Sequence, residues 1–279
     1  MHLLVNTSGG DAPGLNAVIR AIVLAASQRN WKVTGIKNGY EGLLLPPEKG
    51  LLPLTKKAVR GITHVGGTIL GTRNKGHPFE YPVIKNGKTE MVDISDKVIK
   101  HFRKIGADAL IAIGGDGSLK IANEFYKKGI PIVGVPKTID NDVRGTYPSF
   151  GFDTAVMVAT EAIDRLHTTA ESHQRVMVVE VMGRYAGWIA LYSGISGSAD
   201  VILIPEIEYD IKKVCEKIQA REQRGIHFSI VVVAEGAIPK GGKRSLKPTI
   251  PGHMEILGGA AERVAKDIEQ LTAKETRNV

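Results

Sequence analysis

The sequence has a single cysteine, Cys215, among its 279 residues. One cysteine cannot form an intrachain disulfide, and a chain that folds without disulfides is typical of a reducing compartment. Cys215 lies in a stretch with a helical pattern and is a poor candidate for a catalytic thiol. The cysteine content therefore excludes a disulfide-stabilised fold.

Long apolar runs are also lacking. No run approaches the roughly 20 residues that a helix needs to span a bilayer. The N-terminus leads from Met1 directly into Asn6-Thr7-Ser8-Gly9-Gly10, which leaves no room for a signal peptide. We therefore expect a soluble, cytoplasmic protein that does not contact a membrane.

Aromatic residues are scarce, at 5% of the chain. The net charge is +8, but Lys and Arg are scattered, and no basic run is interleaved with aromatic residues. Such an interleaved run would indicate a nucleic-acid surface, so we expect no nucleic-acid partner. The positive charge fits small anionic substrates better, and the 32 glycines favour loops that approach ligands closely.

The stretch Asp108–Ser118 carries the strongest local signal. Five apolar residues predict a buried parallel strand, the glycine turn Gly114–Ser118 follows, and a helical pattern covers Leu119–Lys128. Strand, glycine turn and helix N-terminus together form an anion site, because backbone N–H groups reach phosphate oxygens there. Asp116 fits such a turn if Mg²⁺ lies between its carboxylate and the phosphate. An ordinary turn with Asp116 as helix N-cap is the structural alternative.

A similar arrangement opens the chain. Leu3-Leu4-Val5 predicts a strand, Thr7–Gly14 is a second glycine turn, and apolar residues then recur on one helical face. A second strand is predicted over Lys32–Lys37, and the turn Asn38-Gly39-Tyr40-Glu41-Gly42 follows it, where we expect the aromatic ring to be exposed. Between Pro46 and Glu90 the pattern is weak. There Gly66–Arg73 is either a phosphate-facing loop with Arg73 at its tip or a solvated surface loop.

Carboxylates follow two further predicted strands. Ile130–Val135 leads into Pro136-Lys137-Thr138-Ile139-Asp140-Asn141-Asp142, where one carboxylate could accept a hydroxyl proton and the other hold a metal or the loop. A polar surface turn is the alternative. Phe228–Val233 leads into Ala234-Glu235-Gly236, and ligands bind at such strand tips in open α/β sheets, so Glu235 is placed to contact one.

Strands and helices alternate along the whole chain, which predicts an α/β fold of doubly wound, mostly parallel sheets with helices on both faces. The pattern is interrupted over Arg144–Phe150. We therefore expect one domain at residues 1–149 and a second at residues 150–279. The cleft between the two sheets is expected to hold the active site.

Five segments in order, over nearly the whole chain, resemble the 6-phosphofructokinase family: Ser8-Gly9-Gly10-Asp11-Ala12-Pro13-Gly14-Leu15-Asn16, Gly114–Ser118, Pro136–Asp142, Met182-Gly183-Arg184 and Ala234-Glu235-Gly236. Each motif alone is weak, whereas five in the same order are specific. The resemblance implies phosphoryl transfer from Mg-ATP to the 1-hydroxyl of fructose 6-phosphate, giving fructose 1,6-bisphosphate. It implies that residues 1–149 bind the donor and residues 150–279 the sugar phosphate.

The resemblance also implies residue roles. Asp140 would be the base, Thr138 and Arg184 would also be catalytic, and Asp116 would bind Mg²⁺. The positions around the nucleotide would be Gly10, Tyr40, Arg73, Gly117 and Ser118. The substrate-binding positions would be Lys137, Thr138, Asp140, Asp142, Arg175, Met182, Gly183, Arg184, Glu235 and Arg277. Because Arg175 and Arg277 match arginines that reach a neighbouring subunit's site, we expect a homodimer or homotetramer.

Three residues bear on the donor. Pyrophosphate-using relatives place Asp at the position of Gly117 and Lys at that of Lys137, whereas many ATP-using members have Gly at both. Gly117 leaves the α-phosphate region of ATP open, and Lys137 is compatible with either donor. Ile121 stands where ATP-using relatives often have Gly, and its bulk could crowd a nucleotide. We predict ATP, with pyrophosphate as the alternative.

The chain ends earlier than the family pattern. Relatives continue past a Glu-Thr-Arg segment, here Glu275-Thr276-Arg277, and return to complete the first domain. We therefore expect a C-terminally truncated member. The alternatives are a pyrophosphate-dependent fructose 6-phosphate 1-phosphotransferase and a truncated, non-catalytic sugar-phosphate-binding, nucleotide-binding or regulatory subunit. A dinucleotide dehydrogenase is disfavoured, because neither glycine turn has the G-x-G-x-x-G spacing with an acidic residue about 20 positions later.

Overall fold

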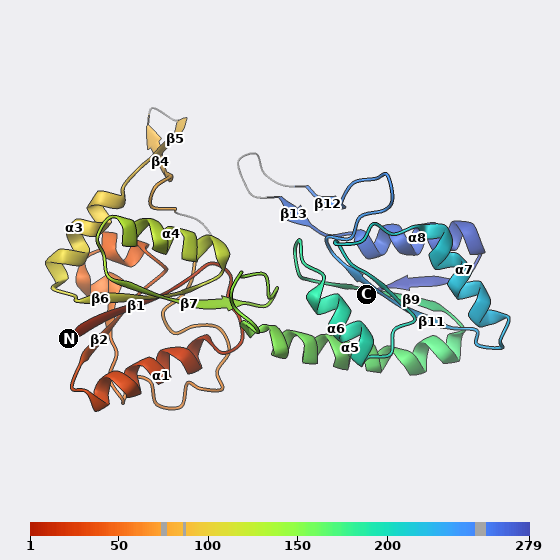
Figure 1. Ribbon diagram of the computed structural model, residues 1–279, viewed down its shortest axis with the longest axis horizontal. Helices are drawn as coiled ribbons and strands as arrows, with labels where there is room; N and C mark the ends of the chain where they lie inside the picture. Colours follow the sequence, from red (N-terminus) through yellow and green to blue (C-terminus); the bar gives the residue numbers. More distant parts are fainter. Residues whose placement is uncertain (74–76, 86–87, 249–254) are drawn as a thin grey trace. The chain divides into compact units, whose positions relative to one another are not determined.

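The computed structural model describes residues 1–73, 77–85, 88–248 and 255–279. The chain divides into two compact units (Figure 1). Unit 1 comprises Met1–Thr138 and Val143–Gly151, and unit 2 comprises Ile139–Asp142 and Phe152–Val279. Each unit is a mostly parallel sheet with helices on both faces, so the predicted α/β class is confirmed.

Unit 1 contains a six-stranded sheet in the order β3-β2-β1-β6-β7-β8. Its strands are β1 (His2–Ser8), β2 (Lys32–Ile36), β3 (Leu51–Pro53), β6 (Ala109–Gly114), β7 (Ile132–Thr138) and β8 (Phe150–Gly151). All neighbours run parallel except β2 and β3. A separate antiparallel ribbon is formed by β4 (Tyr81–Lys85) and β5 (Lys88–Val92).

Helices cover the two faces of this sheet (Figure 1). Successive residues of β1 point to opposite faces, so Leu3 and Val5 pack with α1 (Leu15–Gln28) in one core. Leu4 packs in the other core, which also contains side chains of the remaining unit 1 helices. These are the 3₁₀ helix η1 (Glu41–Leu44), α3 (Ser95–Ile105) and α4 (Asp116–Lys127), and the short α2 (Pro47–Gly50) follows η1.

Unit 2 contains a four-stranded, fully parallel sheet in the order β10-β11-β9-β14. Its strands are β9 (Val176–Val181), β10 (Val201–Leu203), β11 (Ser229–Ala234) and β14 (Thr276–Asn278). One face packs against α5 (Phe152–His173) and α6 (Trp188–Ser196), and the other against α7 (Ile211–Glu222) and α8 (Ala260–Thr272). A short ribbon pairs β12 (Leu246–Lys247) with β13 (Ile256–Leu257).

Two element boundaries differ from the prediction at points that matter for the site. The helix predicted from Leu119 begins at Asp116, because Gly115 is its N-cap and Asp116-Gly117-Ser118 form its first turn. The strand predicted to end at Val135 continues through Pro136 to Thr138. Pro136 is tolerated because proline can lie near the edge of a sheet, where fewer N–H groups must pair, and β8 joins β7 only at Lys137 and Thr138.

The single cysteine and the lack of long apolar runs can both be related to the structure. Cys215 is buried, and burial raises the pKa of its thiol, so little thiolate is present near neutral pH. Within the described ranges, no helix combines the length and the hydropathy that crossing a bilayer requires.

Candidate functional site

The chain reverses its direction of winding in unit 1 between β1 and β6. These strands are parallel neighbours, but α1, which follows β1, and α4, which follows β6, pack on opposite faces of the sheet (Figure 1). The two connecting loops therefore diverge at the carboxyl ends of the strands. Such a divergence leaves a crevice where open α/β sheets bind ligands, and both predicted glycine turns lie there.

Lys137 connects these loops. It lies near the carboxyl end of β7 with 5% of its surface exposed, and its ammonium donates to the Gly10 carbonyl. Gly9 has a φ of +81°, and a Cβ there would lie 3.2 Å from the Ser118 hydroxyl and 3.9 Å from the Lys137 Nζ. The structure thus brings together three predicted residues, Gly10, Ser118 and Lys137, from three separate segments.

Gly10 and Gly117 are glycines that packing does not require. Apart from the adjacent residues and, for Gly117, the backbone of its own helix, no atom of the described residues lies within 4 Å of a Cβ added to either, and neither φ is in the left-handed region. A side chain would therefore enter open space at the helix end rather than collide with the fold. This space is where a phosphate group could approach the backbone N–H groups.

Asp116 lies in the first turn of α4, with 52% of its side chain exposed, and pairs with Lys120 at 2.7 Å. An exposed ion pair of this kind contributes little, so a divalent cation could replace Lys120. The described residues contain no group of three or more His, Cys, Asp or Glu side chains that could hold a metal ion. One carboxylate fits Mg²⁺, which takes most of its ligands from substrate phosphates and water.

The Gly66–Arg73 loop is fixed against the first glycine turn. The Thr72 hydroxyl donates to the Gly9 carbonyl, and the Gly9 N–H donates to the Arg73 carbonyl at 3.3 Å. The Arg73 guanidinium forms an ion pair with Glu41. The loop is therefore an anchored part of the crevice rim, and the contact of Arg73 with a phosphate stays a prediction.

Tyr40 corrects one expectation. The family resemblance places it beside the nucleotide, and the turn in which it lies predicts an exposed ring, yet only 6% of its surface is exposed. Its ring lies 5.0 Å from that of Phe125 in α4, because η1 folds the residue onto that helix. Burial raises the pKa of its hydroxyl. The expected exposure is wrong, whereas the role of Tyr40 at the nucleotide stays a prediction.

Unit 2 repeats the reversal between β9 and β11. These strands are also parallel neighbours, and α6 and α8 follow them on opposite faces. The turn Met182–Gly187 follows β9, and Ala234-Glu235-Gly236 ends β11. The Glu235 Oε1 accepts the Arg184 backbone N–H at 2.9 Å. The structure therefore brings these two predicted segments together at the carboxyl edge.

The turn after β9 depends on close backbone approaches. A Cβ on Gly183, whose φ is +143°, would lie 2.4 Å from the Ala186 carbonyl oxygen, and Arg184 itself has a φ of +50°. The Gly187 N–H donates to Glu206 Oε1 at 2.8 Å. Glu206 was not among the predicted residues, although Glu206 follows the short strand β10 much as Glu235 follows β11. The rule that ligand contacts lie at strand tips would have identified it.

Asp140 lies where the chain passes between the units. Ile139–Asp142 is grouped with unit 2, and Ile139 packs against the same core as α5 and α6. Asp140 is half-buried and Asp142 is exposed, while buried Asn141 has a φ of +54°. The positive φ of Asn141 turns the chain between Asp140 and Asp142, three residues after the end of β7.

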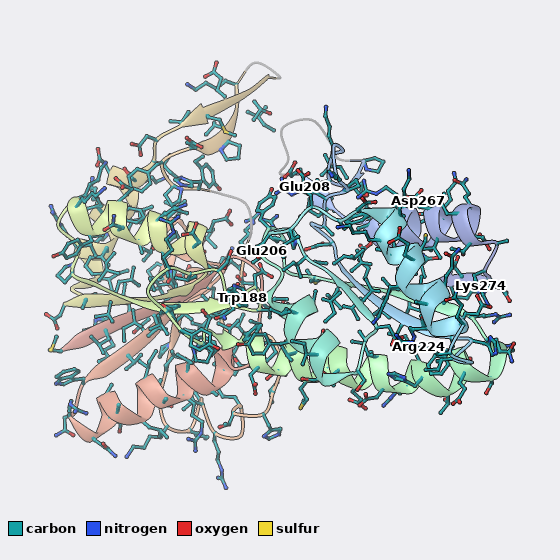
Figure 2. All side chains as sticks on the ribbon, turned by 45° about the vertical axis from the view of Figure 1, so that its right-hand side comes forward. Trp188, Glu206, Glu208, Arg224, Asp267 and Lys274 are labelled. Atoms are coloured by element: carbon teal, nitrogen blue, oxygen red, sulfur yellow. The ribbon has the colours of Figure 1, made fainter. Side chains whose placement is uncertain are left out.

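Arg175 and Arg277 lie apart from the other predicted substrate residues. Arg175 precedes β9 and Arg277 pairs in register with Met177, so both lie at the amino edge of the sheet. Six residues of β9 at about 3.3 Å each place Glu235 and the turn after β9 about 20 Å away. In Figure 2, Lys274 near this edge and Glu206 near the other are at opposite ends of unit 2.

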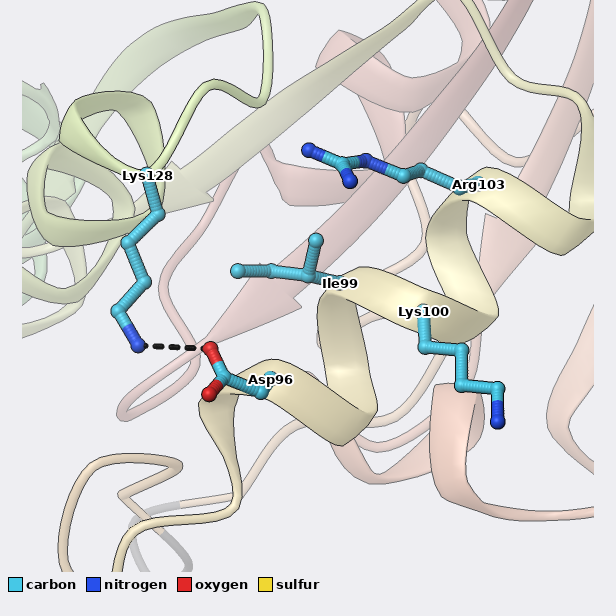
Figure 3. Close-up of a pocket in the computed structure, with 5 residues that line it drawn as sticks. All are labelled: Asp96, Ile99, Lys100, Arg103 and Lys128. Atoms are coloured by element: carbon cyan, nitrogen blue, oxygen red, sulfur yellow. Dashed lines mark hydrogen bonds and ion pairs between the residues drawn. The ribbon is translucent and has the colours of Figure 1, made fainter.

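A hollow of about 480 Å³ lies elsewhere on unit 1, lined by Asp96, Ile99, Lys100, Arg103 and Lys128 (Figure 3). Lys128 follows the last turn of α4, whereas Asp116 begins that helix. The 12 residues of α4 separate the two ends by about 18 Å. The Lys128 ammonium is held by Asp96 at 2.9 Å. This hollow is therefore separate from the glycine turns.

Comparisons with known proteins agree with this arrangement. The family model for phosphofructokinase matches residues 2–279. An ATP-dependent 6-phosphofructokinase of Chloroflexus aurantiacus is 54% identical over 275 residues, covering 99% of this chain and 74% of that relative. A pyrophosphate–fructose 6-phosphate 1-phosphotransferase of Streptomyces coelicolor is 48% identical over 282 residues, covering 99% and 78%. The structure of phosphofructokinase from Saccharomyces cerevisiae matches with a TM-score of 0.80 at 30% identity, over 100% of this chain and 37% of that one.

Gly236→Ala tests the contact between the two unit 2 loops. The added Cβ would lie 2.1 Å from the Arg184 carbonyl oxygen, so the turn must move. We expect the free energy of unfolding in urea to fall by about 1–3 kcal/mol. Gly66→Ala, where the added Cβ meets nothing within 4 Å, is the control and should change it by less than about 0.5 kcal/mol. Equal effects of the two substitutions would refute the close approach.

Proposed function

Because the chain belongs to the phosphofructokinase family, we propose that it transfers the terminal phosphoryl group of Mg-ATP to the 1-hydroxyl of fructose 6-phosphate. The product is fructose 1,6-bisphosphate. The observation that carries this proposal is the buried Lys137, whose ammonium donates to the carbonyl of Gly10, together with the open space at Gly10 and Gly117. Unit 1 binds the donor and unit 2 the sugar phosphate. A cytoplasmic location stays a prediction of the sequence.

The donor phosphates are held by backbone and charge. Phosphoryl transfer needs mainly positioning and neutralisation of the phosphate charge. The N–H groups of the first turn of α4 and of the Gly9-Gly10 turn donate to phosphate oxygens, and the Lys137 ammonium adds positive charge. Asp116 holds Mg²⁺, which neutralises phosphate charge when bound. Asp140 accepts the proton of the 1-hydroxyl as that oxygen attacks the phosphorus atom, with Thr138 beside it.

The sugar is held at the carboxyl edge of unit 2. The Arg184 N–H donates to Glu235 Oε1, and Oε2 has no hydrogen-bond partner in the described part of the chain. Oε2 therefore accepts a sugar hydroxyl in our proposal. Met182 and Gly183 border the same position, and the Arg184 guanidinium stabilises the charge on the transferred group.

A second copy of the chain completes the sugar site. Arg175 and Arg277 lie at the amino edge of the sheet, too far from Glu235 of their own chain to contact the same sugar phosphate. They would therefore clamp the 6-phosphate bound to a neighbouring subunit of a homodimer or homotetramer. Exposed apolar side chains one helical turn apart on α6, Trp188 at 40% and Tyr192 at 38%, also favour such an assembly.

Two observations bear on the donor. Open space at Gly117 favours ATP, and Ile121 packs partly buried against a core of unit 1, so its bulk is directed away from the crevice. Lys137 is compatible with either donor, and the similarity to the Streptomyces coelicolor protein favours pyrophosphate, which remains the second candidate. We propose ATP, because a carboxylate that would repel its α-phosphate is missing at position 117.

Asp140→Asn tests the reaction. An amide cannot accept the hydroxyl proton, so kcat should fall by about three orders of magnitude while KM for fructose 6-phosphate changes by less than about threefold. Steady-state kinetics of fructose 1,6-bisphosphate formation measure both constants. Asp153→Asn, at an exposed position in the first turn of α5, is the matched control. Unchanged turnover of the Asp140 variant would refute its role as the base.

Gly117→Asp tests the choice of donor. The new carboxylate should enter the open space at the start of α4 and repel the phosphates of ATP. We expect kcat/KM for Mg-ATP to fall about 100-fold, which corresponds to about 2.7 kcal/mol. Gly117→Ala adds a methyl group without charge and should cost much less. A 100-fold loss in both variants, or in neither, would contradict the electrostatic explanation.

A further inference from the structure

Glu275 connects the two arginines at the amino edge of unit 2. Its Oε2 lies 2.7 Å from Arg175 Nε, and its Oε1 lies 2.8 Å from an Arg277 terminal nitrogen. Each carboxylate oxygen thus forms an ion pair with one guanidinium group. The two arginines come from segments about 100 residues apart, and this carboxylate is the group that joins their side chains.

The parallel pairing of β14 with β9 creates this arrangement. The Val176 N–H donates to the Glu275 carbonyl at 3.0 Å, which places Glu275 beside Arg175. Residues two apart in a strand point to the same side, so Arg277 follows Glu275 on the same side of β14. The trio is therefore fixed by backbone register and does not depend on chance contacts of long side chains.

The electrostatics of the trio leave one positive charge. Two guanidinium groups and one carboxylate sum to +1, and Glu275 offsets the repulsion between the two cations. The Arg175 contact lowers the pKa of Glu275 most, and the charges of Arg277 and His173 lower it further. The carboxylate is therefore ionised throughout the neutral pH range.

The contact geometry leaves donors available for an anion. The Arg175 Nε lies against Glu275 in an ion pair whose N–H is not aligned for a hydrogen bond, and the two terminal nitrogens of Arg175 have no ion-pair partner among the described residues. Arg277 is anchored a second time, because its other terminal nitrogen donates to the Thr276 carbonyl at 3.0 Å. The exposed fractions of the three side chains are 24% for Arg175, 44% for Glu275 and 56% for Arg277, so a ligand can reach them.

We propose that Glu275 is a positioning residue that holds Arg175 and Arg277 in the orientation in which they bind a phosphate monoester. The inference rests on the proposed function, in which that monoester is the 6-phosphate of the sugar bound to a second copy. A carboxylate paired with the Nε side of Arg175 keeps the guanidinium at this edge by charge and leaves its terminal nitrogens for a ligand. Those nitrogens are the ones that pair with two phosphate oxygens.

The opposite role would be competition, in which the carboxylate occupies the place of the phosphate. The two roles predict opposite changes when the negative charge is removed. If Glu275 competed with the phosphate, removal of its charge would tighten phosphate binding. Loss of a positioning group would weaken it, because two adjacent guanidinium groups repel each other and the ligand must then order both.

Glu275→Gln is the test variant, with Glu269→Gln on an exposed position of α8 as the control of equal charge change. We expect KM for fructose 6-phosphate to rise about tenfold in Glu275→Gln, with kcat within about twofold and KM for the donor unchanged. Glu275→Asp keeps the negative charge on a shorter side chain. Its KM for fructose 6-phosphate should therefore lie between the values for the unmodified chain and for Glu275→Gln. An unchanged or lower KM would overturn the proposal. So would a parallel fall of kcat, donor affinity and Tm, which would indicate a purely structural role.

A binding measurement separates this inference from the proposed function. Inorganic phosphate is added at constant ionic strength, and the rise in Tm is recorded for the unmodified chain. The part of the rise that Arg277→Ala removes belongs to this site, and Glu275→Gln should remove the same part. If Glu275→Gln keeps it, or if Arg277→Ala removes nothing, the inference is wrong. Absence of turnover with either donor would overturn the proposed function alone, and the phosphate measurement would still decide the role of Glu275.

Discussion

Each unit depends on one constraint, the divergence of helices from two neighbouring parallel strands. In unit 1 the strands are β1 and β6, and in unit 2 they are β9 and β11. Because the helices that follow them pack on opposite faces, the loops between cannot close over the strand ends. Both glycine turns and both tight unit 2 loops lie at these openings. The positions of Gly10, Ser118, Arg184 and Glu235 all follow from this winding.

Charge at the carboxyl ends of β1 and β6 depends on which side chains are buried. A buried ammonium needs a polar partner, and Lys137 has one in the Gly10 carbonyl. That contact ties β7 to the first glycine turn and keeps a positive charge beside the ends of β1 and β6. Asp116 is instead exposed, and its carboxylate forms an ion pair with Lys120. The buried ammonium suits an anionic ligand. The exposed carboxylate suits a cation that is bound to that ligand.

Much of this could be predicted from the sequence, because it rests on local patterns. Apolar runs identified β6 and β11, and the glycine turns identified the openings. The sequence could not predict the burial of Tyr40, since that follows from the packing of η1 on Phe125. Nor could it predict that Glu275 joins two arginines, because strand register over about 100 residues leaves no local signal. Family resemblance supplied the residue roles, which chemistry alone left open.

The central claim is that the glycine-lined crevice and the unit 2 loops serve phosphoryl transfer to a sugar phosphate. The most direct test is to incubate the chain with fructose 6-phosphate and Mg²⁺, adding either ATP or pyrophosphate, and to follow the phosphorus NMR spectrum. We predict a new resonance of the 1-phosphate of fructose 1,6-bisphosphate with ATP. Product with pyrophosphate alone would contradict the assigned donor, and no product with either donor would contradict the central claim.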